Sequence, residues 1–265
     1  MQKPKLPPGF NGCFGHRGAA GLCPENTLAS FELAHSLGAD VLETDARITR
    51  DGHFVLFHDA TLERTTDGEG LVSSLTLAEI LQLDAGAKFL DSDGQPLMKG
   101  LGFRVPTLEA VMKTFGSARF NIELKGEDPA IAEAFGEALL RCGARDRVVL
   151  AAEDGAVMNA IRKHISWAPT GTSAPEVFAF VSQLATDEPV EPLLGCALQV
   201  PHWFGEIEVV TQRFVDQAHR DGLAVHVWTI NSPVEMQQLL SLGVDGIFTD
   251  HPERWRTLNT LRTYA

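Results

Sequence analysis

The sequence has no long apolar run, little positive charge and few cysteines. No stretch approaches the roughly 18 consecutive apolar residues of a membrane-spanning helix, and residues 1–10 contain no apolar core of a signal peptide. Lys and Arg number 22 against 35 Asp and Glu, a formal net charge of -13. Clustered Lys and Arg hold nucleic acids and anionic membranes. We therefore expect neither as the main partner, and an anionic substrate would need a local positive centre.

Cysteine usage indicates the compartment. Cys13, Cys23, Cys142 and Cys196 are widely spread and include no C-x-x-C pair. This spacing favours free thiols in a reducing compartment over a disulfide framework. With no apolar span and no signal peptide, it predicts a cytoplasmic protein without stable membrane insertion.

Short β-branched or aromatic runs alternate with helical patterns along the 265 residues. This alternation is typical of parallel strands joined by right-handed crossovers. The predicted strands are 12–14, 40–45, 54–57, 120–124, 148–151, 169–172, 197–200, 224–230 and 246–249. The predicted helices are 27–37, 108–115, 130–142, 155–164, 211–221 and 232–242. Asn26 is placed to cap the first helix, while Gly222 and Gly243 are stop signals for the last two.

Nine predicted strands are one more than an eight-stranded barrel needs. Only the turn 49–52 separates the second from the third, so these two either form a hairpin or share one barrel position. We predict a closed (β/α)8 TIM barrel and not an open doubly wound sheet, because polar groups recur after strands throughout the chain.

One segment, residues 61–104 after the third strand, breaks the alternation. It is rich in Asp, Gly, Ser and Thr and is too long for an ordinary connection. It is either an inserted lid over the site or a surface loop. Because no internal repeat or linker-like run appears, we expect a single domain over residues 1–265.

Carboxylates lie on shared faces of two strands. Alternation puts Glu43 and Asp45 on one face of their strand, and Glu123 with Lys125 on one face of another. Three carboxylates at two strand ends form a candidate ligand set for a hard divalent cation, Mg²⁺ or Ca²⁺. The alternative is a solvated face or an internal salt bridge, such as Glu123 with Lys125.

His16 and His58 each stand at the end of a predicted strand. Two histidines near neutral pKa can serve as base and acid at a phosphorus centre, although strand-end histidines also have structural roles. A zinc site that combines His16 with nearby cysteines has no evident fourth ligand. Trp228 shares a face with His226, and is either a wall of the pocket or an aromatic that fills the barrel.

Eight short motifs carry a family resemblance. They are Gly-His-Arg-Gly at 15–18, Pro-Glu-Asn-Thr at 24–27, Glu43-x-Asp45, Asp51-Gly52, His58-Asp59, Arg64-Thr-Thr-x-Gly68, Ile-Glu-Leu-Lys at 122–125 and Asp-Gly-Ile-Phe-Thr-Asp at 245–250. In this order and spacing, the sequence resembles the glycerophosphodiester phosphodiesterase family from residue 14 to about residue 255. Each motif alone is weak evidence, whereas eight in register are very hard to obtain by chance.

The resemblance implies a metal-dependent phosphodiesterase on a (β/α)8 barrel with an insertion after the third strand. Its metal ligands would be Glu43, Asp45 and Glu123. Its acid/base pair would be His16 and His58, and Arg17 and Lys125 would hold the phosphate. The implied reaction hydrolyses glycerophosphodiesters, such as glycerophosphocholine or glycerophosphoethanolamine, to glycerol 3-phosphate and an alcohol. Residues 19–23 and 228–231 vary from the family pattern, which can alter how the leaving group fits.

Three other functions stay open. A lysophospholipase D-type enzyme would use the same groups but needs an exposed apolar approach, which residues 89–90 or 202–204 could supply. A non-catalytic barrel that binds a metal or phosphate ester would have no need of two histidines. A barrel aldolase or isomerase would need Lys125 as a neutral amine, which neighbouring Glu123 opposes. A homodimer is a candidate assembly.

Overall fold

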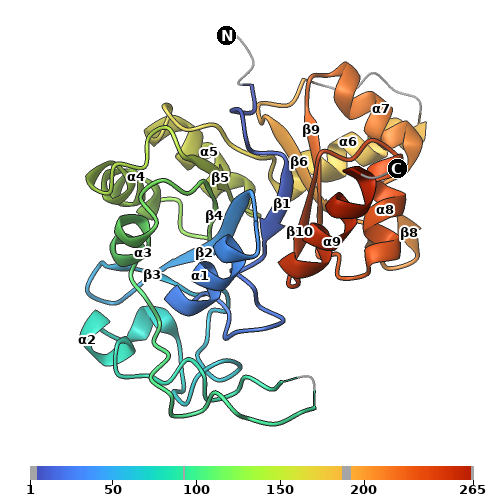
Figure 1. Cartoon of the computed structure of the whole chain (residues 1–265). Helices are drawn as coiled ribbons and strands as arrows, with labels where there is room; N and C mark the ends of the chain where they lie inside the picture. The colour runs from blue at the N-terminus through green and yellow to red at the C-terminus, as the bar shows by residue number, and fades with distance from the viewer. Residues whose placement is uncertain (1–4, 92, 187–191, 264–265) are drawn as a thin grey trace.

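The computed structural model describes residues 5–91, 93–186 and 192–263, and a curled parallel sheet lies at its centre (Figure 1). The parallel strands are β1 (Gly12–Gly15), β2 (Val41–Ile48), β4 (Phe120–Leu124), β5 (Val148–Ala151), β6 (Ala197–Pro201), β9 (Ala224–Trp228) and β10 (Gly246–Thr249). Their order is β5-β4-β2-β1-β10-β9-β6.

Two isolated parallel bridges join the ends of this sheet. Leu150 pairs with Thr170, and Gly171 pairs with Ala197, so residues 170–171 connect β5 to β6. The predicted strand at 169–172 is present as these bridges alone. The sheet therefore closes with residues 170–171 in the eighth position, which confirms the predicted (β/α)8 TIM barrel.

Two antiparallel hairpins extend from the barrel. β3 (Phe54–Leu56) pairs with the end of β2, Arg47 opposite Val55, so the second and third predicted strands form a hairpin. Gly52 has a φ of 83° in its turn, a conformation that favours glycine. The second hairpin, β7 (Trp203–Phe204) and β8 (Ile207–Glu208), follows β6 and was not predicted.

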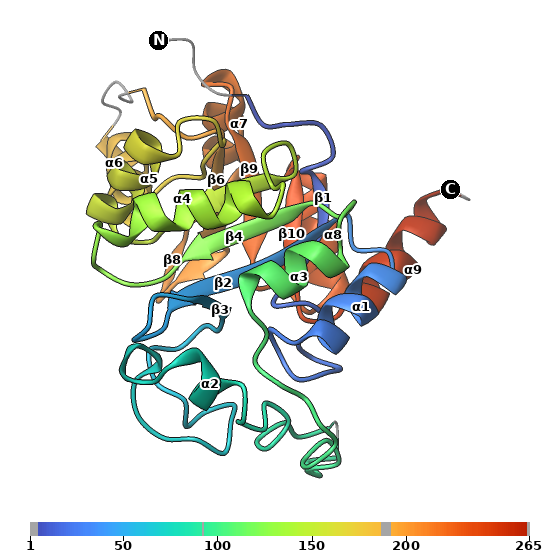
Figure 2. The same ribbon diagram turned by 90° about the vertical axis from the view of Figure 1, so that its left-hand side faces the viewer.

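Helices surround the barrel (Figures 1 and 2). They are α1 (Leu28–Ser36), α3 (Leu108–Thr114), α4 (Ile131–Arg141), α5 (Gly155–His164), α6 (Ala174–Thr186), α7 (Gln212–Arg220), α8 (Pro233–Ser241) and α9 (Pro252–Thr263). Sequence reasoning missed α6 and α9. Gly222 and Gly243 have positive φ just beyond α7 and α8, as the predicted stop signals require. In the described ranges, no helix has the length and apolar character needed to cross a membrane.

The cap of α1 differs from the prediction. The Thr27 hydroxyl, and not the Asn26 side chain, accepts the Ser30 N–H. Asn26 has a φ of 55°, and its side chain donates to Asp45 and accepts from Thr44 on β2. The Asn26 prediction was wrong because this residue connects the loop before α1 to the strand that carries the carboxylates.

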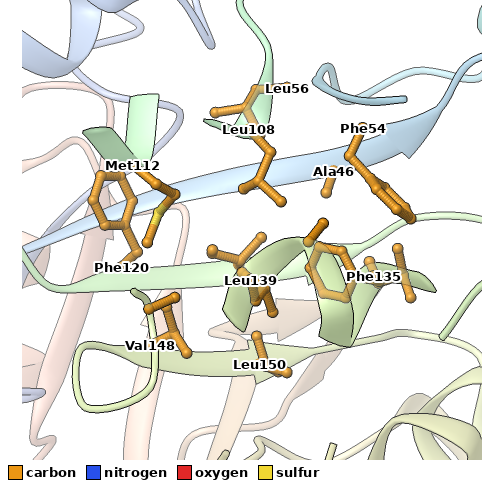
Figure 3. Packing of buried hydrophobic residues seen from close by; sticks show 14 of the residues in the cluster. Ala46, Phe54, Leu56, Leu108, Met112, Phe120, Phe135, Leu139, Val148 and Leu150 are labelled. Carbon is orange, nitrogen blue, oxygen red and sulfur yellow. The ribbon is translucent and has the colours of Figure 1, made fainter. Parts of the chain in front are cut away.

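A hydrophobic cluster fixes β2 and β4 against the helices on the outside of the barrel. Figure 3 shows Phe120 of β4 beside Met112 of α3, and Leu139 of α4 over the same sheet. The rings of Phe54 and Phe135 lie 5.1 Å apart. Full burial of such a side chain contributes about 1.5–3 kcal/mol. This packing holds the backbone of the two strands from which Glu43, Asp45 and Glu123 project.

Aromatic and polar side chains fill the barrel interior. Phe14 and Phe248 stack with ring centroids 4.5 Å apart. His226 is fully buried beside them, and its Nδ1 lies 3.4 Å from the Gln199 amide nitrogen. That amide also donates to Asn121 across the barrel, at 2.8 Å.

Acidification should destabilise the fold through His226. Burial lowers the pKa of His226 from 6.5 to about 4, so the unfolded chain takes up a proton at a pH where the folded protein does not. The stability that this group contributes is present above the unfolded pKa and lost as pH falls. We expect a loss on the order of 2–3 kcal/mol in the free energy of unfolding between about pH 7 and pH 4.5. Urea unfolding at both values should show a smaller loss for His226→Gln, and an equal loss would contradict this assignment.

The insertion, residues 61–104 without residue 92, is anchored to the β2–β3 hairpin. It contains a 3-10 turn (Val72–Ser74) and α2 (Leu77–Ile80), and Figures 1 and 2 show it beside the barrel in cyan to green. Leu62, Val72 and Ile80 pack in one buried cluster with Val55 of β3. A single domain over residues 1–265 stays a prediction, and its ends, 1–4 and 264–265, lie outside the described residues.

Candidate active site

Seven of the eight predicted site residues lie within β2, near the end of β4, or just after β1, β3 and β4. They are His16, Arg17, Glu43, Asp45, His58, Glu123 and Lys125. Trp228 ends β9, which β10 and β1 separate from β2 in the sheet. It is 42% exposed at the rim of the barrel, so its role as a pocket wall stays a prediction.

The three carboxylates share one region of the barrel mouth. Asp45 pairs in register with Glu123, and Lys125 Nζ lies 2.8 Å from Glu123 Oε1 and 3.5 Å from Asp45 Oδ1. Glu43 and Asp45 are buried at 4% and 1% exposure. Burial, and then the Asp45 charge, raises the pKa of Glu43 to about 7. Burial opposes ionisation of Asp45 too, but Lys125 and Arg17 outweigh it and lower the Asp45 pKa.

Arg17 connects these carboxylates to the loop before α1. Its backbone N–H donates to Glu43 Oε2 at 2.8 Å, and Nη1 donates to Glu25 Oε1 at 2.9 Å. Its Nε, 3.5 Å from Asp45 Oδ2, is buried and has no hydrogen-bond partner among the described residues. The Arg17 guanidinium is therefore paired with two carboxylates, Glu25 and Asp45. Its role in holding a phosphate stays a prediction.

His16 is fixed by a carboxylate at the far end of the chain. Its Nδ1 lies 2.7 Å from Asp250 Oδ1, and Asn231 donates to the other Asp250 oxygen at 2.7 Å. Burial alone would lower the pKa of His16, but the Asp250 hydrogen bond and the nearby Glu43 raise it overall. A donated Nδ1–H leaves Nε2 available for proton transfer.

His58 has a similar arrangement with an adjacent carboxylate. Its Nδ1 lies 2.6 Å from Asp59 Oδ1, and Arg47 Nε donates to the His58 carbonyl at 2.8 Å. Burial lowers the pKa of His58, although the Asp45 charge opposes this. The pKa values of His16 and His58 are therefore shifted in opposite directions, which is the usual sign of an acid/base pair.

The carboxylates fit a divalent cation in chemistry, but the structure does not gather them around one. Across the described ranges, no group of three or more His, Cys, Asp or Glu side chains is placed to hold a metal ion. The Lys125 ammonium contacts both Asp45 and Glu123. Burial nevertheless raises the pKa of both Glu43 and Glu123. Carboxylate oxygens are hard donors, and Mg²⁺ or Ca²⁺ would compensate the negative charge that burial makes unfavourable.

Sequence reasoning assigned no role in the site to several polar residues that the structure places around it. They are Glu25, Asn26, Asp59, Arg64, Asn231 and Asp250. All of these except Asn231 occur in the quoted motifs, and the position of Asp59 beside His58 is a usable signal. The Asp250 partnership was harder to find because 234 residues separate it from His16; the available signal was that both follow strands that are neighbours, β10 and β1.

Comparison with known proteins identifies the family. The model of the glycerophosphoryl diester phosphodiesterase family matches residues 16–254. The chain belongs to this family. It is 34% identical over 244 residues to a glycerophosphodiester phosphodiesterase of Caldanaerobacter subterraneus subsp. tengcongensis, covering 90% of this chain and 93% of that relative. The predicted enzyme class, a phosphoric diester hydrolase, is thereby confirmed.

Two further relatives extend the comparison. A mouse protein of the family, named a lysophospholipase D, is 27% identical over 90% of this chain and 83% of its own length. A phosphodiesterase of Oleispira antarctica, solved in complex with its product sn-glycerol-3-phosphate, is 24% identical with a TM-score of 0.74, covering 97% of each chain. This structural likeness supports the barrel fold.

Proposed function

We propose that this protein hydrolyses glycerophosphodiesters, such as glycerophosphocholine and glycerophosphoethanolamine, to glycerol 3-phosphate and an alcohol. The observation that carries the proposal is the pair His16 and His58, each held by a carboxylate at 2.7 and 2.6 Å. They lie at the barrel mouth that also contains Arg17 and Lys125. A phosphodiester resists anionic attack, so its hydrolysis requires charge neutralisation and two proton transfers.

The proposed cofactor is a divalent metal ion, Mg²⁺ or Ca²⁺, held by Glu43, Asp45 and Glu123. When bound, such an ion supplies positive charge for the phosphate and the transition state. The support is the donor set, since burial disfavours the charge of Glu43 and Glu123.

The side chains of the site divide the remaining work. Arg17 and Lys125 bind the non-bridging phosphate oxygens. One histidine takes the proton of the neighbouring glycerol hydroxyl as its oxygen attacks phosphorus, and the other protonates the leaving alkoxide. The bond from phosphorus to the alcohol oxygen breaks, which leaves a cyclic glycerol phosphate. Water then opens the ring while the two histidines exchange roles. This sequence of steps follows the family resemblance.

Product analysis tests the proposed activity. The purified protein is assayed with Mg²⁺ or Ca²⁺ on glycerophosphocholine, glycerophosphoethanolamine and a simple diester without a glycerol hydroxyl. We expect glycerol 3-phosphate and free choline or ethanolamine from the first two and little turnover of the third. Release of glycerol with phosphocholine would contradict the proposed position of cleavage. Ligand binding without turnover would favour the non-catalytic barrel.

The structure opposes the Schiff-base alternative. Glu123 and Asp45 outweigh burial and raise the pKa of Lys125, so the amine stays protonated at neutral pH. A charged ammonium cannot attack a carbonyl carbon.

A lysophospholipase D-type activity is a second candidate, favoured by exposed apolar residues after β6. Trp203, Phe204 and Ile207 of the β7–β8 hairpin are 51%, 73% and 60% exposed. His202 at the base of this hairpin contacts Glu235 of α8 at 2.7 Å, and Trp228 pairs in register with Pro201. Exposed apolar side chains near the barrel mouth could receive an acyl chain.

Replacing Trp203 and Phe204 by alanine should separate the two substrates. Loss of two apolar contacts of about 1.5–3 kcal/mol each would lower kcat/KM on lysophosphatidylcholine by at least about tenfold. Glycerophosphocholine, which has no acyl chain, should be turned over as in the wild type. Wild-type inactivity on lysophosphatidylcholine would instead eliminate this candidate. The cytoplasmic location and the homodimer stay predictions.

A further inference from the structure

Arg64, in the insertion, joins two carboxylates that touch different parts of the site. Its Nη1 and Nη2 donate to the two oxygens of Glu25, both at 2.7 Å. Its Nε donates to Asp59 Oδ2, and Nη2 also donates to Asp59 Oδ1 at 2.9 Å. One guanidinium therefore makes four hydrogen bonds to two acidic residues from different loops.

Each of these carboxylates holds a residue of the proposed mechanism. Asp59 Oδ1 accepts from Arg64 and also lies 2.6 Å from His58 Nδ1. Glu25 Oε1 accepts from Arg64 and also from Arg17 Nη1, at 2.9 Å. The four hydrogen bonds of Arg64 go to Glu25 and Asp59, and not to the proposed metal ligands. Its influence on the reaction would therefore pass through Asp59 and Glu25.

The requirement for arginine follows from the geometry. A planar guanidinium can serve two carboxylates at once with fixed donor directions, whereas an ammonium is a point charge on a flexible stem. Arg64 is 46% exposed, but Glu25 and Asp59 are only 17% and 26% exposed. A charge network of this kind is worth more than an isolated surface pair.

We propose that Arg64 is a positioning residue that couples the insertion to catalysis. By fixing Asp59 it holds the His58 ring with Nδ1–H toward the carboxylate and Nε2 toward the substrate. By fixing Glu25 it holds the Arg17 guanidinium in place for the phosphate. The insertion thus supplies one side chain on which both proton transfer and substrate binding depend. This inference rests on the proposed function.

The main test compares Arg64→Gln with two other variants at saturating divalent metal on glycerophosphocholine. We expect Arg64→Gln to lower kcat about 10- to 100-fold and to raise KM. Losses of this size are usual when a residue that holds a ligand of a metal site is replaced. Arg64→Lys should recover only part of kcat. The matched control is Arg50→Gln, because Arg50 also binds the insertion, through the Ser74 carbonyl and Glu79. It should keep kcat within about twofold of the wild type.

Two further measurements separate positioning from general destabilisation. Adding Arg64→Gln to Asp59→Asn should cost less than about twofold in kcat beyond Asp59→Asn alone, since the two act as one unit. Nitrogen NMR of histidine-labelled protein, assigned with His58→Gln, should show one His58 tautomer in the wild type and a mixture in Arg64→Gln.

The outcomes distinguish this inference from the proposed function. If wild-type protein releases no glycerol 3-phosphate, the proposed function fails first. If the wild type is active and Arg64→Gln keeps both kcat and the His58 tautomer, the inference is overturned. An equal loss of kcat in Arg50→Gln would overturn it as well. So would losses of kcat that multiply when Arg64→Gln is added to Asp59→Asn.

Discussion

Replacing His58 with alanine should lower kcat on glycerophosphocholine by about 10²- to 10⁴-fold, the usual contribution of one general acid or base. The wild-type ring is held by Asp59 at 2.6 Å, and burial lowers its pKa. Burial favours a neutral imidazole that can accept a proton, while the Asp59 carboxylate orients the ring and stabilises the imidazolium that forms. Alanine removes the proton carrier and leaves Arg17 and Lys125 in place, so KM should change much less than kcat.

The same assay should be run on His16→Ala and on a control histidine. His16→Ala should give a loss of similar size, because both proton transfers are needed in each half of the reaction. His53 is exposed in the turn of the β2–β3 hairpin, so His53→Ala should stay within about twofold of the wild type. Near wild-type turnover of either catalytic variant would remove that histidine from the mechanism.

A loss of activity of comparable size is expected when Glu43 is replaced by glutamine. Glu43→Gln keeps the shape of the side chain and an oxygen that can accept the Arg17 N–H, but removes the charge proposed to bind metal. Because changes to outer residues of metal sites already cost 10- to 100-fold in affinity, loss of a direct ligand should weaken Mg²⁺ or Ca²⁺ binding by more than about 100-fold. Isothermal titration calorimetry measures this directly.

Glu43→Gln should also leave the protein at least as stable as the wild type. Burial and the Asp45 charge raise the pKa of Glu43 to about 7, so its ionised form is unfavourable in the folded protein. A neutral amide avoids this cost, and the melting temperature should stay equal or rise while activity is lost. The matched control is Glu109→Gln, on the exposed face of α3. It should change neither the melting temperature nor the activity. Loss of stability together with activity would indicate a structural role.

The strand ends were the most predictable part of this chain. Alternation along β2 predicted that Glu43 and Asp45 share one face, because a strand has only two faces. It left open whether that face is solvated, and the structure buries both side chains. The hairpin between β2 and β3 could not be chosen from sequence, since a short turn also permits two strands to share one barrel position. The register that sets Asp45 beside Glu123 became visible only in the structure.

The partners of the catalytic side chains were much less predictable. A local pattern cannot show which carboxylate will meet His16, because Asp250 reaches it only after the barrel closes between β10 and β1. Asn26 illustrates a related difficulty. Its residue type and position suit a helix cap, and only the competing contacts with Thr44 and Asp45 reveal its other role.

Release of glycerol 3-phosphate before and after metal removal tests the central claim most directly. The wild-type protein is treated exhaustively with a chelator, assayed on glycerophosphocholine, and assayed again after addition of Mg²⁺ or Ca²⁺. We predict that chelation removes nearly all activity and that one of these ions restores it in the wild type but not in Glu43→Gln. Full activity after exhaustive chelation, with no increase on adding either ion, would contradict the account.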